Sequence, residues 1–130
     1  MAVNSSDTES ILLVDDNPTN LQVLFQTLEG VQCKLLIAKD GESALTIAEK
    51  ALPDLILLDI MMPGIDGWET LTRLKRDPET SGVPVIIFTA REHARGHQKS
   101  SEMGAADYFR KPFEPDELIE LVEKHVGQGV

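Results

Sequence analysis

The feature that most constrains the fold of this chain is a series of five short apolar segments. They are short for helices, and they lack the strict alternation of polar and apolar residues that marks a strand with one wet face. Continuous apolar runs of this length are typical of strands buried on both faces of a parallel sheet. The five predicted strands are ILLV at 11–14, KLLIA at 34–38, LILL at 55–58, VIIF at 85–88 and DYF at 107–109.

Segments with a helical spacing of apolar residues alternate with the predicted strands. They begin at the start signals Asn17-Pro18, Asp40-Gly41, Asp66-Gly67 and Pro115. Strands that alternate with helices predict an α/β fold, in which a doubly wound parallel sheet carries helices on both faces. The apolar positions of the helices are Leu21, Leu24, Phe25 and Leu28; Ala44, Leu45 and Ala48; Leu71 and Leu74; and Leu118, Ile119, Val122 and Val126.

The length and composition of the chain fit one globular domain. Its 130 residues, 42% hydrophobic and 26% charged, are enough for one core. Residues 1–9 have neither a basic start nor an apolar run, so we expect a short disordered lead into a soluble, cytoplasmic protein that does not enter a membrane. The net charge of -10 would repel a nucleic-acid backbone, and we expect no direct binding of nucleic acid.

Polar residues stand at the carboxyl ends of four predicted strands. Asp15 and Asp16 follow the first strand, Asp59 the third, Thr89 the fourth and Lys111 the fifth. Ligands of open α/β sheets gather outside this edge, where three carboxylates, one hydroxyl and one ammonium would meet. Neighbouring carboxylates repel each other, and a hard divalent cation such as Mg²⁺ removes that cost.

Each of these residues also has a purely structural explanation. Asp16 and Asn17 could cap the helix that follows them, and Asp59 could be a turn residue. Thr89 would then be an ordinary strand residue and Lys111 an ordinary solvated one. Their convergence on one edge of the sheet favours a functional site.

Four segments of the chain resemble the characteristic motifs of response regulator receiver domains, and they occur in the same order. They are ILLVDDN, LILLDIMMPGIDG, PVIIFTA and DYFRKPF. The resemblance implies a five-stranded (βα)5 sheet of order 2-1-3-4-5 within a flavodoxin-like three-layer sandwich. It also implies a receiver domain over residues 10–126, followed by a short tail at 127–130.

The resemblance implies a phosphoryl-transfer role for the acid cluster. Asp59 would accept a phosphoryl group from a phosphohistidine on a sensor histidine kinase or a histidine phosphotransfer protein. Asp15, Asp16, Asp59 and the backbone carbonyl of Met61 would hold Mg²⁺. The domain would catalyse only its own phosphoryl transfer and dephosphorylation, so it is expected to be a signalling protein rather than an enzyme.

The remaining motif residues would bind and report the phosphoryl group. Lys111 would pair with Asp59 and then with the phosphoryl oxygens, and Thr89 would hydrogen-bond them. Tyr108 would turn inward behind Thr89 as part of a conformational switch. Phosphorylation would thereby change a surface that an output protein or domain recognises.

The resemblance implies that residues 91–105 form the fourth helix of the domain. We expect the recognised surface to include this helix together with the fifth strand and fifth helix. Arg91, Arg95 and Lys99 are spaced four apart and would form a basic stripe on that fourth helix. Few large apolar residues and a glycine in its middle would make it the least stable helix of the domain.

Three other protein classes share parts of this pattern. A haloacid-dehalogenase hydrolase needs a second aspartate two residues after its nucleophile, where this chain has Met61. A flavin or dinucleotide carrier would have a phosphate-binding glycine loop after the first strand, and this chain has no G-x-G-x-x-G there. The alternative that stays open is a receiver-fold protein-binding module that works without phosphorylation.

Overall fold

The computed structural model of the chain describes residues 9–28, 33–60, 64, 67–89, 102–110 and 115–125. The strands are β1 (Glu9–Val14), β2 (Cys33–Ala38), β3 (Leu55–Asp59), β4 (Val85–Thr89) and β5 (Asp107–Arg110). They pair in parallel to form one five-stranded sheet in the order β2-β1-β3-β4-β5. The parallel α/β sheet predicted from the apolar runs is confirmed, and so is the strand order implied by the family resemblance.

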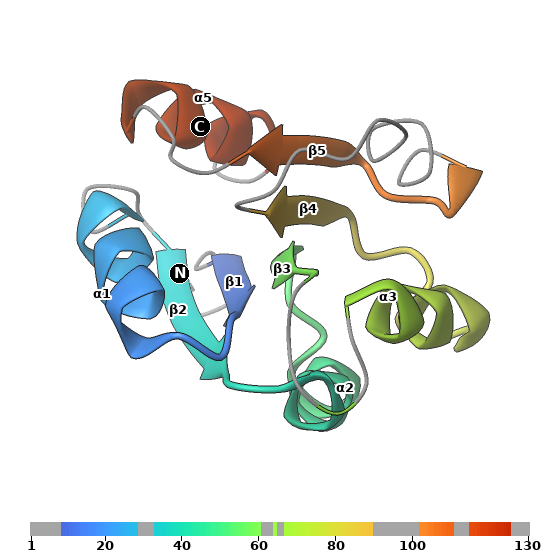
Figure 1. The fold of residues 1–130 in the computed structure, drawn as a ribbon. Helices are drawn as coiled ribbons and strands as arrows, with labels where there is room; N and C mark the ends of the chain where they lie inside the picture. The colour runs from blue at the N-terminus through green and yellow to red at the C-terminus, as the bar shows by residue number, and fades with distance from the viewer. Residues whose placement is uncertain are drawn as a thin grey trace, which may run out of the picture.

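Helices cover both faces of the sheet. In Figure 1, α1 (Pro18–Thr27) and α5 (Pro115–His125) lie on one face, and α2 (Gly41–Ala51) and α3 (Gly67–Arg76) lie on the other. All of them begin at the start signals found in the sequence. Among the described residues, no helix is both long enough and apolar enough to cross a membrane.

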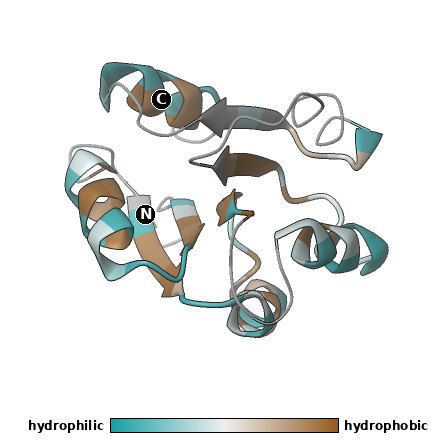
Figure 2. Cartoon of the chain, in the orientation of Figure 1, coloured by the Kyte–Doolittle hydropathy of each residue, from teal (hydrophilic) through white to brown (hydrophobic). Residues whose placement is uncertain are grey.

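Two hydrophobic clusters hold these layers together, because successive strand residues point to opposite faces. Figure 2 shows the hydrophobic residues concentrated in the strands and on the helix sides that face them. The cluster under α1 and α5 contains Ile11, Leu13, Leu21, Leu24, Leu28, Leu55, Leu57, Ile86, Phe88, Leu118 and Val122. The cluster under α2 and α3 contains Leu12, Val14, Ala38, Ala44, Ala48, Ile56, Leu58, Ile60, Leu71, Leu74, Val85 and Ile87.

The structure departs from the predicted elements at two places. Phe25 belongs to the apolar pattern of α1, yet its side chain is 42% exposed, because it lies at the margin of the buried stripe formed by Leu21 and Leu24. The predicted helix over 91–105 does not extend to its expected end. Glu102 is helical, but a turn follows it, and Gly104 has a φ of 96°, which lies outside the helical region.

Leu52 provides a test of local backbone strain. It ends α2 in the left-handed conformation, with φ 46° and ψ 64°, and it is the only non-glycine residue of positive φ in the described part of the chain. Glycine adopts this conformation without steric cost. Because Leu52 is 50% exposed and loses little packing on truncation, we expect Leu52→Gly to raise the free energy of unfolding by about 1 kcal/mol. Urea denaturation measures this change.

The matched control is Ala51→Gly, one residue earlier and still within α2. Glycine inside a helix costs about 1 kcal/mol relative to alanine, so this variant should be less stable than the wild type. If Leu52→Gly lowered the unfolding midpoint as Ala51→Gly does, the strain at Leu52 would be refuted.

Candidate metal centre

The parallel pairing of β1 with β3 brings two aspartates to one end of the sheet. The register pairs Val14 with Leu58, so the next residues along the two strands are Asp15 and Asp59. Asp16 follows immediately on the β1 side. One carboxylate oxygen from each of these three aspartates lies within 4.8 Å of the others. The structure thus forms the acid cluster that the sequence predicted.

Two members of the cluster are buried, and the third is exposed. Asp15 has no exposed surface and Asp59 has 5%, whereas Asp16 faces solvent. The Asn17 backbone N–H donates to Asp15 Oδ1 over 3.0 Å, which fixes that carboxylate. Two ionised carboxylates at this separation repel by about 3 kcal/mol at an effective dielectric constant of about 20. Such a buried pair therefore favours a nearby positive charge.

Capping of α1 does not require Asp16. The Asn17 side chain accepts hydrogen bonds from the backbone N–H groups of Thr19 at 2.8 Å and Asn20 at 3.2 Å. Asn17 is thus the N-cap of the helix. Asp16 therefore does not cap α1, and its carboxylate lies in the acid cluster instead.

Asp40 stands at the carboxyl end of β2 but has a structural role. It is the N-cap of α2, and its Oδ1 accepts from the Ser43 backbone N–H over 2.7 Å. Hydrogen bonds from Ser43, chiefly from its backbone N–H, hold the pKa of Asp40 below its usual value. The carboxyl-terminal edge of the sheet therefore carries one capping carboxylate, Asp40, and separately the cluster of three aspartates.

The cluster suits a hard divalent cation. Mg²⁺ prefers oxygen ligands and is commonly held by one or two carboxylates, with water and a phosphoryl oxygen completing its shell. Asp15 and Asp59 supply buried carboxylates at the ends of adjacent strands, and Asp16 supplies one that faces water. The donor set and its partial exposure fit this ion.

Two further predicted residues lie on the neighbouring strands. Thr89 is the last residue of β4, at the same sheet edge as Asp59. Tyr108 pairs with Ile87 in the β4–β5 register and packs against the cluster under α2 and α3, with its hydroxyl oxygen buried. Lys111, Met61, Arg91, Arg95 and Lys99 lie outside the described residues.

Sequence reasoning missed the role of Gly67 beside the acid cluster. Gly67 begins α3, and its backbone N–H donates to the Ile60 carbonyl over 2.9 Å. Its α-carbon lies so close to Asp59 that a β-carbon there would overlap the Asp59 carbonyl oxygen. The Asp66-Gly67 pair marked a helix start in the sequence, but no pattern indicated this contact.

Comparison with known proteins gives consistent matches along most of the chain. Residues 11–123 match the response regulator receiver domain family. Protein PilH of Pseudomonas aeruginosa is 36% identical over 86% of this chain and 93% of its own length. Response regulator PleD of Caulobacter vibrioides is 40% identical over 80% of this chain, but the match spans only 23% of PleD.

A solved structure matches the fold as well. It is the receiver domain of sensor histidine kinase PA1611 from Pseudomonas aeruginosa, described with a magnesium ion coordinated in its active-site cleft. The TM-score is 0.83 and the sequence identity 30%, over 92% of this chain and 98% of that one.

The acid cluster predicts that Mg²⁺ stabilises the folded protein. Binding to the folded state alone adds about 2.7 kcal/mol at a Mg²⁺ concentration one hundred times the dissociation constant. Asp16→Asn should remove most of this gain. Without metal, the variant should be more stable than the wild type by about 1 kcal/mol, because it lacks the repulsion between the exposed Asp16 carboxylate and the other two. Thermal unfolding with and without MgCl₂ measures both effects.

Glu79→Gln is the matched control, since it removes one negative charge from an exposed residue that is not part of the cluster. It should keep the full Mg²⁺-dependent rise in melting temperature. An equal rise in Asp16→Asn would contradict the placement of the metal at these three aspartates.

Proposed function

The chain belongs to the response regulator receiver domain family, and from that membership we propose that Asp59 is its phosphoacceptor. The observation that carries the proposal is the cluster of three carboxylates, with Asp59 at the end of β3, between β1 and β4. Asp59 is 5% exposed, so a small part of the residue reaches solvent while the rest is enclosed by the fold.

Receiver domains are phosphorylated by histidine kinases and act on output partners. For this chain we propose a phosphohistidine on a sensor kinase or phosphotransfer protein as the donor. No direct contact with nucleic acid is part of the proposal, because the chain carries a net charge of -10. PleD is much longer than this chain, so the activity of the whole PleD protein is not attributed to this chain.

The proposed reaction is an in-line phosphoryl transfer to a carboxylate. An Asp59 oxygen forms a bond to phosphorus while the bond from phosphorus to the donor nitrogen breaks, and the electron pair of that bond leaves with the donor imidazole. The reaction needs the donor to be positioned and the charge between the carboxylate and the phosphoryl oxygens to be neutralised. The buried pair Asp15 and Asp59 makes this neutralisation the main requirement.

Positive charge would come from two sources. Mg²⁺, held by Asp15, Asp16, Asp59 and the Met61 carbonyl, would offset the negative charge of the phosphoryl oxygens. The Lys111 ammonium would pair with the same oxygens.

Thr89 and Tyr108 would make the site responsive to phosphorylation. A hydroxyl at the end of β4 would donate to the new phosphoryl group, and Tyr108 would rearrange behind it. The added charge of about -1.5 to -2 at pH 7 is large enough to reorganise a neighbouring loop. We propose that the change reaches the fourth-helix segment and its basic residues Arg91, Arg95 and Lys99.

The proposed domain extends over residues 10–126, between a lead at 1–9 and a tail at 127–130. The family match over residues 11–123 supports these limits to within a few residues. We propose a cytoplasmic location, where the kinase domains that phosphorylate receivers have access to ATP.

Intact-mass spectrometry tests the proposed phosphoacceptor. Incubation with acetyl phosphate and Mg²⁺ should add about 80 Da, the mass of one phosphoryl group. Asp59→Asn should not gain this mass, because an amide is not a nucleophile toward phosphorus.

Asp54→Asn serves as the matched control. Asp54 lies before the start of β3, where its Oδ2 accepts from the Ser10 backbone N–H over 2.8 Å, and it is not part of the cluster. This variant should be phosphorylated normally. The absence of an adduct from acetyl phosphate and from phosphohistidine donors would support the protein-binding module instead.

Hydrogen exchange tests the proposed switch surface. Beryllofluoride, which mimics a phosphoryl group on a carboxylate, should change the protection of residues 90–105, because the fourth-helix segment begins directly after Thr89-Ala90. Asp59→Asn should show no change on addition of the same reagent. Equal protection of residues 90–105 in wild type with and without beryllofluoride would refute the switch.

A further inference from the structure

The backbone of α3 makes an unusually close contact with the proposed phosphoacceptor. A β-carbon added to Gly67 would overlap the Asp59 carbonyl oxygen and would lie 2.5 Å from Ile60 Cα and 3.0 Å from the Asp59 carbonyl carbon. Non-bonded carbon atoms are normally about 3.5 to 4 Å apart. Gly67 is also buried, so a side chain would have no open direction at this position.

Backbone conformation does not explain the glycine. Gly64 and Gly104 have φ values of 75° and 96°, which favour glycine, whereas Gly67 is not among the residues of positive φ. An L-amino acid could therefore adopt the backbone angles of residue 67. What the position requires is space, and the atoms that occupy the space belong to Asp59 and Ile60.

The two sides of this contact are both held in place. Asp59 ends β3, where it pairs with Phe88 of β4, and β3 is flanked by β1 on its other side. The Gly67 N–H donates to the Ile60 carbonyl over 2.9 Å, which links the start of α3 to the residue after Asp59.

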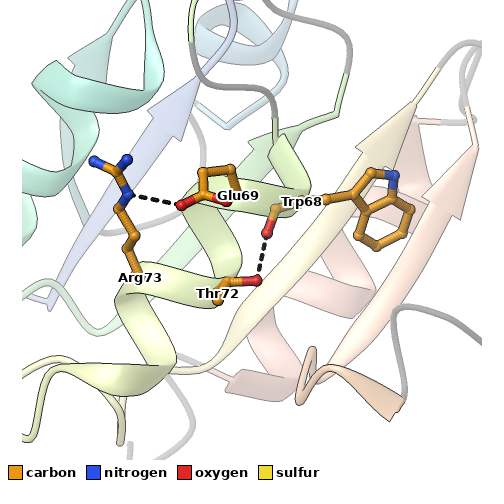
Figure 3. A network of polar contacts seen from close by, with 4 residues as sticks. All are labelled: Trp68, Glu69, Thr72 and Arg73. Carbon is orange, nitrogen blue, oxygen red and sulfur yellow. Dashed lines mark hydrogen bonds and ion pairs between the residues drawn. The ribbon is translucent and has the colours of Figure 1, made fainter.

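The first turns of α3 are reinforced as well. Figure 3 shows the Thr72 hydroxyl donating to the Trp68 carbonyl over 2.9 Å, and Arg73 Nε paired with Glu69 Oε2 over 2.9 Å. Leu71 and Leu74 anchor the helix in the cluster under α2 and α3. A β-carbon at residue 67 could not be accommodated by simple fraying of the helix, and part of the displacement must fall on Asp59 and Ile60.

We propose that Gly67 is a positioning residue for Asp59. Because glycine has no side chain, the start of α3 can pack directly against the Asp59 main chain and fix its position. The inference rests on the proposed function of Asp59 and extends it to a residue that touches neither metal nor phosphoryl group. A misplacement of about 1 Å can slow a reaction that depends on positioning by about one hundredfold. Phosphoryl transfer to Asp59 is such a reaction.

The test compares Gly67→Ala with Gly82→Ala, which makes the same chemical change in open space. Nothing lies within 4 Å of a β-carbon built on Gly82. Phosphorylation by acetyl phosphate at saturating Mg²⁺ is followed by intact mass as a function of acetyl phosphate concentration. We expect the maximal rate of Gly67→Ala to fall by about one hundredfold, with little change in the half-saturating concentration. Gly82→Ala should match the wild type.

A third variant separates positioning from loss of stability. Leu71→Ala removes buried atoms from α3 within the hydrophobic cluster under α2 and α3 and leaves residue 67 unchanged, so it should lower the melting temperature and keep the wild-type phosphorylation rate below that temperature. If Leu71→Ala were slowed as much as Gly67→Ala, the effect would come from a loosened helix and the inference would be wrong.

The remaining outcomes are also decisive. If Gly67→Ala does not fold, it is combined with Leu52→Gly and measured again; a chain that still does not fold overturns the inference, because Gly67 would then serve folding rather than positioning. If the wild type is phosphorylated and Gly67→Ala is phosphorylated equally fast, the inference is overturned but the proposed function of Asp59 is not. A wild type that takes up no phosphoryl group overturns the proposed function, and the inference with it.

Discussion

The parallel pairing of β1 with β3 is the constraint on which the site depends. Both strands are buried on their two faces, so the register between Val14 and Leu58 is fixed by packing in both clusters at once. A slip of one residue would turn every buried side chain of a strand toward the opposite cluster. The same register sets Asp15 opposite Asp59 one step further on. The hydrophobic core thus forces two carboxylates together.

The cost of that arrangement explains the chemistry proposed for it. Asp15 and Asp59 are almost fully buried, and a third carboxylate lies within 4.8 Å of them. The fold provides the stability that keeps this repulsive cluster together, and a bound divalent cation would relieve the repulsion. Helix α1 contributes by the Asn17 cap, whose own N–H fixes Asp15. The proposed metal binding and the fold therefore depend on the same few residues.

Most of the fold was predictable because its signals are local. Apolar runs identified four strands and the short segment DYF the fifth. Asn17-Pro18, Asp40-Gly41, Asp66-Gly67 and Pro115 identified the helix starts. The strand order came from family resemblance, since no local pattern encodes it. The acid cluster was predictable because carboxyl ends of parallel strands meet at one edge.

What the sequence could not show depends on distances between segments. Helical periodicity places Phe25 on the apolar side of α1 but does not give the width of the buried stripe, and Phe25 is exposed at its margin. The contact joins Gly67 to Asp59, eight positions earlier in the sequence. The sequence around a glycine does not show whether the position needs space or an unusual backbone angle. Whether Asp16 or Asn17 caps α1 likewise depends on the three-dimensional structure, in which Asn17 is the cap.

We propose that Asp15, Asp16 and Asp59 together bind a divalent cation. Crystals of the protein soaked in MnCl₂ test it directly, because Mn²⁺ accepts the same oxygen ligands and can be located by its anomalous scattering. We predict a peak among the three carboxylates, at about 2.1 Å from at least one of their oxygens. A peak at another group of acids, or an empty cluster at saturating Mn²⁺, would contradict a cation site at these three aspartates.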